Sequence, residues 1–197
     1  MYMSRAGTQG FTLLEVLITL IVLAIGLLGL ANLQSKMQIV QVESYQRAQA
    51  VLLVQDMVNR VNANRANAAA YPGTNVGAST DGFDYKAACN QATTAAQDVC
   101  EWSKALKGAT ECTAFDNQGN CTGATRGGLI GGRGCVTQVQ APNNVTCIPG
   151  SILISVAWQG LNATVAPGNA CAQGAYGNDD RLRRVISQRT VISLPRC

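Results

Sequence analysis

The chain has 197 residues, of which 47% are hydrophobic and 13% are charged, against about a quarter charged in ordinary soluble domains. This composition excludes a disordered acidic or basic tail. The formal net charge of +4 is too small to indicate nucleic acid or acidic lipid as a partner. The sequence has no histidine, which excludes Ser–His and Cys–His nucleophile pairs, imidazole metal ligands and histidine pH switches.

A long apolar segment follows the first ten residues, in which Arg5 is the one charged side chain. From Phe11 to Ala31 the chain has 21 residues and one charged side chain, Glu15. As a helix this segment would be about 31 Å long, enough to cross the hydrocarbon core of a bilayer. A secretory signal peptide has a shorter apolar stretch and an A-x-A-like cleavage site, and no such site follows Ala31. We therefore expect a membrane-spanning helix.

Glu15 is the exception within this apolar segment. A carboxylate costs about 2.5–3.5 kcal/mol at the centre of a membrane helix and less near its end. Two interpretations remain open. Either Glu15 reaches the membrane interface, or it needs a positive partner in the membrane or in an assembly. The nearest candidate for that partner is an amine created at residue 11 by proteolysis between Gly10 and Phe11.

The helical pattern continues beyond the membrane segment. Apolar or small residues recur every three to four positions, and no proline occurs before Pro72. We expect a helix from Phe11 to about Asn64 whose second half is amphipathic. Ser44 and Ala48 within the stripe count against a coiled coil. The stripe comprises Leu30, Leu33, Met37, Val40, Ser44, Ala48, Val51, Val54, Val58 and Val61.

Two glycines, Gly26 and Gly29, lie inside the apolar half of this helix. Each costs about 1 kcal/mol relative to alanine in a helix interior. They indicate either close packing between helices in the membrane or a stretch of helix that can unwind, and both interpretations stay open.

All eight cysteines lie after residue 88. An even number at these spacings indicates a disulfide framework formed in an oxidising compartment, so we expect the C-terminal part to be exported. A zinc cluster is disfavoured because the sequence has neither a CxxC motif nor a histidine. We expect pairing between neighbours in the sequence, with Cys171 joined to Cys197. The eight are Cys89, Cys100, Cys112, Cys121, Cys135, Cys147, Cys171 and Cys197.

The segment after the long helix predicts a loop and then a second helix. Asn, Ala and Gly are frequent from Arg65 to Gly82, which indicates a loop. A helix is expected from Ala95 to Lys107, with Thr94 and Gln97 as a capping-box pair and Gly108 at its end.

Three strands are predicted in the last third of the chain. Residues 109–134 are rich in glycine and predict irregular loop. Strands are expected at Cys135–Gln140, Ser151–Gln159 and Val185–Leu194, of which the second has the clearest alternation. A helix followed by antiparallel strands predicts an α+β domain whose sheet covers one face of the long helix.

The remaining polar clusters do not form a catalytic constellation. The glycine-rich run from Arg126 to Gly134 lacks the GK[ST] ending of a phosphate loop and predicts turns. Four arginines near the C-terminus, Arg181, Arg183, Arg184 and Arg189, are expected on a solvated strand face rather than against DNA. We expect no enzymatic activity, no cofactor and no metal site.

The segment from Gly10 to Glu15 (GFTLLE), after a short leader that contains Arg5, resembles the class III signal of type IV pilins and their pseudopilin relatives. The resemblance implies that an inner-membrane prepilin peptidase cuts between Gly10 and Phe11 and then methylates the new amine of Phe11. It also implies that Glu15 pairs with the free amine of a neighbouring subunit and sets the axial register of the filament.

A narrower resemblance follows from the glycine pair before Leu33-Gln34 and from the stretch Gln55–Arg60 with Asn62–Asn64. These segments are similar to PilV-type minor pilins. The resemblance implies a structural subunit that primes or caps type IV pilus assembly and supports adhesion and twitching motility. A pseudopilin of a type II secretion system and a minor pilin of a DNA-uptake (competence) pilus are the alternatives.

The resemblance also implies the fold and the division of the chain. The expected fold is α+β and type IV pilin-like, with a long N-terminal helix packed on a small antiparallel sheet and stapled by disulfides. Residues 1–10 are the expected leader, 11–33 the transmembrane and filament-core helix, 34–66 its amphipathic half, and 67–197 the exported globular domain.

The implied partners are prepilin peptidase, other minor pilins, the major pilin and a tip adhesin, with the bacterial inner membrane before assembly and the pilus after it. Nucleic acid is not expected as a partner.

Overall fold

The computed structural model describes residues 10–84, 86–109, 113–118, 120, 122, 128–143 and 145–193. The chain divides into two compact units, one ending at Val42 and one beginning at Glu43. Four of the predicted features lie outside the described residues: the leader before Gly10, and the disulfide partners Cys112, Cys121 and Cys197.

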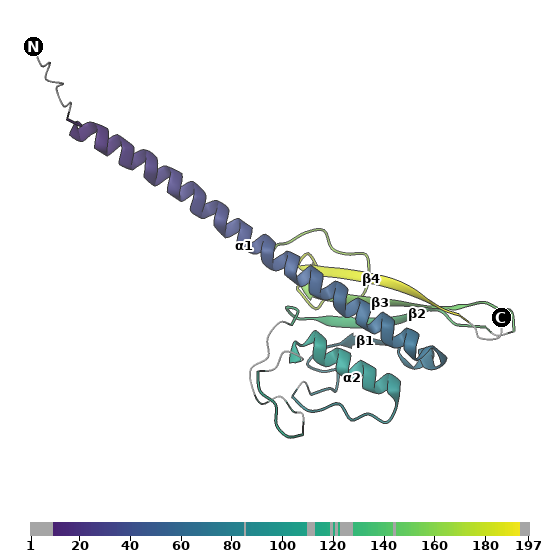
Figure 1. The fold of residues 1–197 in the computed structure, drawn as a ribbon. Helices are drawn as coiled ribbons and strands as arrows, with labels where there is room; N and C mark the ends of the chain where they lie inside the picture. The colour runs from purple at the N-terminus through teal and green to yellow at the C-terminus, as the bar shows by residue number, and fades with distance from the viewer. Residues whose placement is uncertain are drawn as a thin grey trace, which may run out of the picture. The chain divides into compact units, whose positions relative to one another are not determined.

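The long helix α1 runs from Leu13 to Ala63 and has 51 residues (Figure 1). The predicted helix from Phe11 to about Asn64 is therefore confirmed to within two residues at each end, a difference that is usual for helix boundaries. Up to Val42 its large apolar side chains are exposed, Leu13 to 90%, except for Ile39, which is half-buried. By length and composition α1 can cross a membrane, and the apolar stretch that allows it to do so is not buried.

The C-terminal unit contains a four-stranded antiparallel sheet in the order β1-β2-β3-β4 (Figure 1). The strands are β1 (Gly73–Val76), β2 (Arg133–Gln140), β3 (Gly150–Gln159) and β4 (Arg183–Ile192). All three strands that the sequence predicted are present, with ends shifted by one or two residues. The C-terminal part of α1 and the shorter helix α2 (Thr94–Leu106) lie on one face of this sheet.

The main core lies between the two helices and the sheet. Trp102 of α2 is completely buried in it, and its indole nitrogen donates to the carbonyl of Leu53 at 2.8 Å. From the sheet, Ile154 and Val156 pack against the same cluster. Gly134 lets the β2 backbone approach α2 closely, since a Cβ atom there would lie 2.3 Å from the ring of Trp102. The indole ring of Trp102 and the absence of a side chain at Gly134 together fix the position of α2 on β2.

The buried face of α1 differs in part from the predicted stripe. Val54, Val58 and Val61 are buried as expected, but Ser44 and Ala48 are exposed. In the turns of α1 before Val54, the buried residues are instead Gln46 and Ala50. The physical reason is that the Gln46 side chain accepts a hydrogen bond from the backbone nitrogen of Ile130 at 3.0 Å, so burial of its amide is compensated. The small side chain of Ala50 allows α1 to pack closely against the core.

The start of α2 also differs from the prediction. Thr93, rather than Thr94, is the N-cap, and its hydroxyl accepts from the backbone nitrogen of Ala96 at 3.2 Å. Gln97 does not complete a capping box. Its side chain instead bonds Gln91, Cys89 and Glu101. The end of α2 is as predicted, because Gly108 has a positive φ of 75° and donates its N–H to the last turn.

Two short elements occupy the segment that the sequence predicts as loop. A 3-10 helix, η1, spans Arg65–Ala70, and β1 follows it. β1 has four residues, and Asn75 within it has a positive φ of 58°. Strands this short and irregular are stabilised by their partner strand rather than by their own sequence, which is why the local pattern missed it.

Disulfide bonds join Cys89 to Cys100 and Cys135 to Cys171. The first joins neighbours in the sequence, as expected. The second contradicts the expected pairing of Cys171 with Cys197 and of Cys135 with Cys147. Sheet formation brings β2 beside the loop that precedes β4, so Cys135 and Cys171 meet although 36 residues separate them. Cys147 is disulfide-bonded as well, and none of the cysteines in the described ranges is free.

The prediction of a solvated arginine face is wrong for Arg183. Its side chain is only 2% exposed and forms a salt bridge of 3.2 Å with Asp180. Its guanidinium also donates to the carbonyls of Pro167, Asn169 and Cys171. A planar guanidinium can donate several hydrogen bonds at once, so this arginine holds the loop between β3 and β4 together instead of facing solvent.

Candidate functional site

The start of α1, in the N-terminal unit, is the first candidate site. Gly10, Phe11 and Thr12 precede the helix and are not helical. The carbonyl of Thr12 accepts the first helical hydrogen bonds, from the backbone nitrogens of Glu15 at 3.1 Å and Val16 at 3.3 Å. The peptide bond between Gly10 and Phe11 therefore lies in non-helical backbone, outside the hydrogen bonding of the helix.

Thr12 caps this helix. Its hydroxyl accepts from the backbone nitrogen of Glu15 at 3.3 Å, which compensates one of the free N–H groups that every helix start leaves. Sequence reasoning missed this role. Thr12 followed three residues later by Glu15 has the pattern of a capping box, and that pattern was the signal that could have found it.

Glu15 lies in the first turn of α1, where the helix dipole favours a negative charge. Phe11 is 82% exposed, and Leu14 and Val16 beside Glu15 are also exposed. Within the described part of the chain no lysine or arginine forms a salt bridge with Glu15. The carboxylate is thus held at the end of an apolar helix, with the dipole as its only favourable charge interaction among the described residues.

One further polar group in the apolar segment is satisfied locally. The hydroxyl of Thr19 donates to the carbonyl of Val16 at 2.8 Å. A hydroxyl that bonds its own helix in this way can lie in lipid at little cost. Glu15 therefore remains the one charged group between Gly10 and Asn32.

Residues 5–31 match the prokaryotic N-terminal methylation motif. The chain is a type IV pilin-like protein. The motif carries the class III signal and implies processing by prepilin peptidase and assembly with other pilins, and the α+β fold with its long helix, antiparallel sheet and disulfides is pilin-like as predicted. Pilin-like proteins are typically non-enzymatic structural proteins. Neither the search of curated proteins nor the search of solved structures returned a match.

A charged network joins α1 to α2 in the C-terminal unit of this pilin-like protein. Arg60 on α1 forms salt bridges with Asp56 at 3.0 Å, Asp98 at 3.1 Å and Glu101 at 2.6 Å. Burial lowers the pKa of the Arg60 guanidinium, but its hydrogen bonds to Glu101 and the two aspartates raise it overall. Hydrogen bonds from Arg60 and Gln97 hold the pKa of Glu101 below its usual value. The pairs with Asp98 and Glu101 tie α1 to α2, and the pair with Asp56 lies within α1.

Tyr71 extends this network towards β1. Its hydroxyl donates to Asp98 at 2.5 Å and accepts from the side-chain amide of Asn64 at 3.1 Å. Burial, together with the hydrogen bond to the Asp98 carboxylate, raises the pKa of the Tyr71 hydroxyl to about 12. The network therefore fixes the end of α1 and the turn that follows it.

A second acidic side chain organises the loop after β1. Asp81 accepts from the backbone nitrogens of Gly77 and Phe83, from the hydroxyl of Ser103 at 2.5 Å and from Lys107 at 2.7 Å. Burial alone would raise the pKa of Asp81, but these hydrogen bonds lower it below its usual value. This carboxylate holds the loop on α2.

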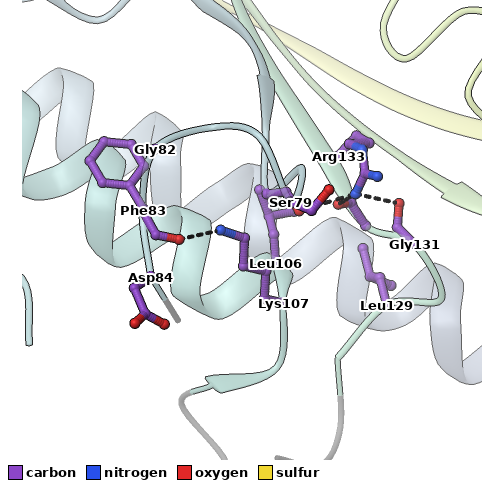
Figure 2. A pocket seen from close by; sticks show the side chains of 11 residues that line it. Ser79, Gly82, Phe83, Asp84, Leu106, Lys107, Leu129, Gly131 and Arg133 are labelled. Carbon is purple, nitrogen blue, oxygen red and sulfur yellow. Dashed lines mark hydrogen bonds between the residues drawn. The ribbon is translucent and has the colours of Figure 1, made fainter. Parts of the chain in front are cut away.

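A cavity of about 660 Å³ lies beside this loop and is lined in part by two cationic side chains, those of Lys107 and Arg133 (Figure 2). Lys107 donates to the carbonyl of Phe83 at 2.6 Å in addition to Asp81. Arg133 donates to the carbonyls of Gly77, Gly131 and Gly132. Both cationic side chains are engaged by the protein. Of the glycine-rich run, residues 129–132 form a turn as predicted, whereas Arg133 and Gly134 belong to β2 because they pair with β3, and residues 126 and 127 lie outside the described part of the chain.

No group of three or more metal-ligating side chains occurs among the residues that the structure describes.

Proposed function

We propose that this protein is a minor pilin of the type IV pilus, which primes or caps pilus assembly with other minor pilins and supports adhesion and twitching motility. The observation that carries the proposal is the first turn of α1, where a methylation motif places one carboxylate at the end of an exposed apolar helix. The glycine pair before Leu33-Gln34 and the stretch Gln55–Arg60 support the minor-pilin role through their similarity to PilV-type proteins.

The proposed maturation uses the non-helical segment before α1. Prepilin peptidase would cleave between Gly10 and Phe11 and methylate the amine of Phe11. Both residues precede the helix and Phe11 is exposed, so the bond is available to a protease without unwinding α1. Residues 1–10 would then be the leader, 11–33 the membrane and filament-core helix, 34–66 its amphipathic half and 67–197 the exported domain.

The proposed assembly step is the transfer of the apolar helix from lipid into a bundle of similar helices. A lone carboxylate at the membrane centre costs about 2.5–3.5 kcal/mol, and in a dry bundle an unpaired charge is also costly. The amine of Phe11 on a neighbouring subunit would neutralise Glu15 there. The pairing would favour one axial offset between subunits, because only that offset brings the two charges together.

The C-terminal unit has the features of a stable exported domain. Its two described disulfides and the Arg60 network hold α1, α2 and the sheet together. The partners would be prepilin peptidase, other minor pilins, the major pilin and a tip adhesin, and the protein would reside in the inner membrane before it joins the pilus.

Processing is tested by the variant Gly10→Val, compared with Gly7→Val as a matched control inside the leader. Mass spectrometry of the purified chains should show unprocessed protein for Gly10→Val and a methylated N-terminal Phe11 for the wild type and the control. Normal maturation of Gly10→Val would refute the cleavage site.

Assembly is tested by Glu15→Gln, which removes the charge at nearly constant size, with Ile18→Ala one turn further on as the control. Both should insert into the membrane and be processed, but Glu15→Gln alone should be depleted from sheared pili by about tenfold or more. Equal incorporation would remove the pairing role. A deletion that blocks protein secretion and leaves piliation and twitching intact would instead identify a secretion pseudopilin.

A further inference from the structure

A cavity of about 480 Å³ opens on the face of the sheet opposite the helices. Its walls come from β1, β2, β3 and the loop at residues 169–173, which are far apart in the sequence. On this face Thr137 and Leu153 are paired across β2 and β3, and they alternate along the strands with core residues such as Val136 and Ile154. The volume lies within the range of about 300–1,000 Å³ that is usual for small-molecule sites.

The wall formed by the loop is held rigidly. The disulfide between Cys135 and Cys171 fixes the loop to β2. The side-chain amide of Asn169 donates to the hydroxyls of Ser155 at 3.1 Å and Ser187 at 3.0 Å, and its oxygen accepts from the backbone nitrogen of Cys171 at 2.7 Å. The guanidinium of buried Arg183 donates to the carbonyls of Asn169 and Cys171. The cavity is therefore preformed, which lowers the entropic cost of binding a ligand.

The described lining carries no charged side chain. Four of its side chains are neutral hydrogen-bonding groups that are exposed and have no hydrogen-bond partner among the residues described. The apolar part of the lining includes Leu153, which is half-buried, and Ala170, which is exposed. The four polar side chains are Thr74, Asn75, Thr137 and Gln173.

These groups define the chemistry of a ligand. Two hydroxyls and two amides can each donate and accept hydrogen bonds, as the hydroxyls of a sugar require. The leucine and alanine side chains offer apolar surface to the C–H face of a sugar ring. The described lining holds no cationic side chain to attract a phosphate or carboxylate, and no anionic one to attract an amine. This cavity differs in that respect from the one beside Lys107 and Arg133.

We propose that the cavity lined by Thr74, Asn75, Thr137 and Gln173 binds a neutral carbohydrate. A peptide fits the cavity less well, since the lining offers no charge for its termini and no deep apolar pocket for an anchoring side chain. The inference concerns the exported domain alone and does not depend on how the protein is processed or assembled.

The test is saturation-transfer difference NMR on the full chain in detergent micelles. The probes are methyl glucoside, methyl galactoside, N-acetylglucosamine, cellobiose and lactose, with glucuronate, glucosamine and a triserine amide as comparisons. At least one neutral sugar should receive saturation on its ring protons and bind more tightly than all three comparison probes. Its Kd should be nearly independent of salt, because no ion pair is involved.

The variant Thr137→Val, Gln173→Ala removes two of the free groups and keeps the strand residue isosteric. Each lost hydrogen bond is expected to weaken binding severalfold, so the pair should raise Kd by about tenfold or more. The matched control is Thr80→Val, Gln118→Ala, which changes two exposed residues outside the cavity and should leave Kd unchanged.

Four results would overturn the proposal. They are no saturation transfer to any neutral sugar, an equal Kd in the cavity variant, tighter binding of a charged sugar, and tighter binding of the peptide amide. Mass spectrometry under non-reducing conditions and near-UV circular dichroism confirm that each variant is folded with its disulfides intact, so a loss of binding is assigned to the cavity.

Discussion

Replacing Cys135 and Cys171 by alanine should destabilise the C-terminal unit more than replacing Cys89 and Cys100. The first disulfide closes a loop of 36 residues and the second a loop of 11. The loss of chain entropy in the unfolded state then corresponds to about 4 kcal/mol for the longer loop and about 3 kcal/mol for the shorter one. The expected difference is about 1 kcal/mol.

Urea unfolding of the full chain in detergent measures both values. The protein has two tryptophans, Trp102 and Trp158, and both are buried in the core, so their fluorescence reports unfolding of this unit. The alanine variants keep the other disulfide as an internal control. The loop-closure reasoning is refuted if the variant that lacks the Cys135–Cys171 disulfide is as stable as the wild type. It is also refuted if that variant is more stable than the one that lacks the Cys89–Cys100 disulfide.

Three further predictions concern single side chains. Asp81→Asn removes a largely buried carboxylate charge and leaves the half-buried Lys107 without its ion-pair partner, so it should cost about 3 kcal/mol in urea unfolding. An unchanged midpoint would show that the loop is held by other contacts. The hydroxyl of Tyr176 donates to the carbonyl of Gly131 at 2.6 Å. Burial raises the pKa values of Tyr71 and Tyr176 to about 12, so the stability they provide is complete below pH 10 and is lost as the pH rises through 12. Absorbance titrations of the wild type, Tyr71→Phe and Tyr176→Phe test this, and the loss of an ordinary titration near pH 10 in each variant would contradict it. Gly134→Ala would place a Cβ atom 2.3 Å from the Trp102 ring and should cost about 1–3 kcal/mol in thermal unfolding; a neutral effect would show that the ring can move.

The long helix could be predicted because its signal is local and extends over many residues. The apolar segment, the absence of proline and the stripe that includes Val54 and Val58 all indicate the same helix. The positions of Ser44 and Ala48 could not be predicted, because burial there depends on which loop the helix meets. Gln46 is buried only because the backbone nitrogen of Ile130 lies within hydrogen-bonding distance.

The sheet and its cross-links show the same distinction between local and long-range signals. The long strand β3 has a clear alternation, whereas β1 exists because β2 offers it a partner. The pairing of Cys135 with Cys171 and the burial of Arg183 both follow from the path of the loop between β3 and β4. No spacing in the sequence specifies that path.

The candidate site at the start of α1 shows a pattern in the sequence alone, and the roles assigned to its residues stay predictions. Gly10, Phe11 and Glu15 stand out because glycine, an aromatic residue and a carboxylate precede or begin an apolar helix. The cavity on the opposite face of the sheet left no comparable pattern, since Thr74, Thr137 and Gln173 are ordinary surface residues until the fold brings them together.

Because Thr12 makes the earliest main-chain bonds of α1, hydrolysis of the linkage between Gly10 and Phe11 would sever none of the hydrogen bonds on which that helix depends. The helix would be the same in precursor and product. Cleavage would remove the leader with its Arg5 and replace the neutral peptide group before Phe11 by an ammonium. Maturation would then change the charge before α1 and leave the folding of the subunit unchanged.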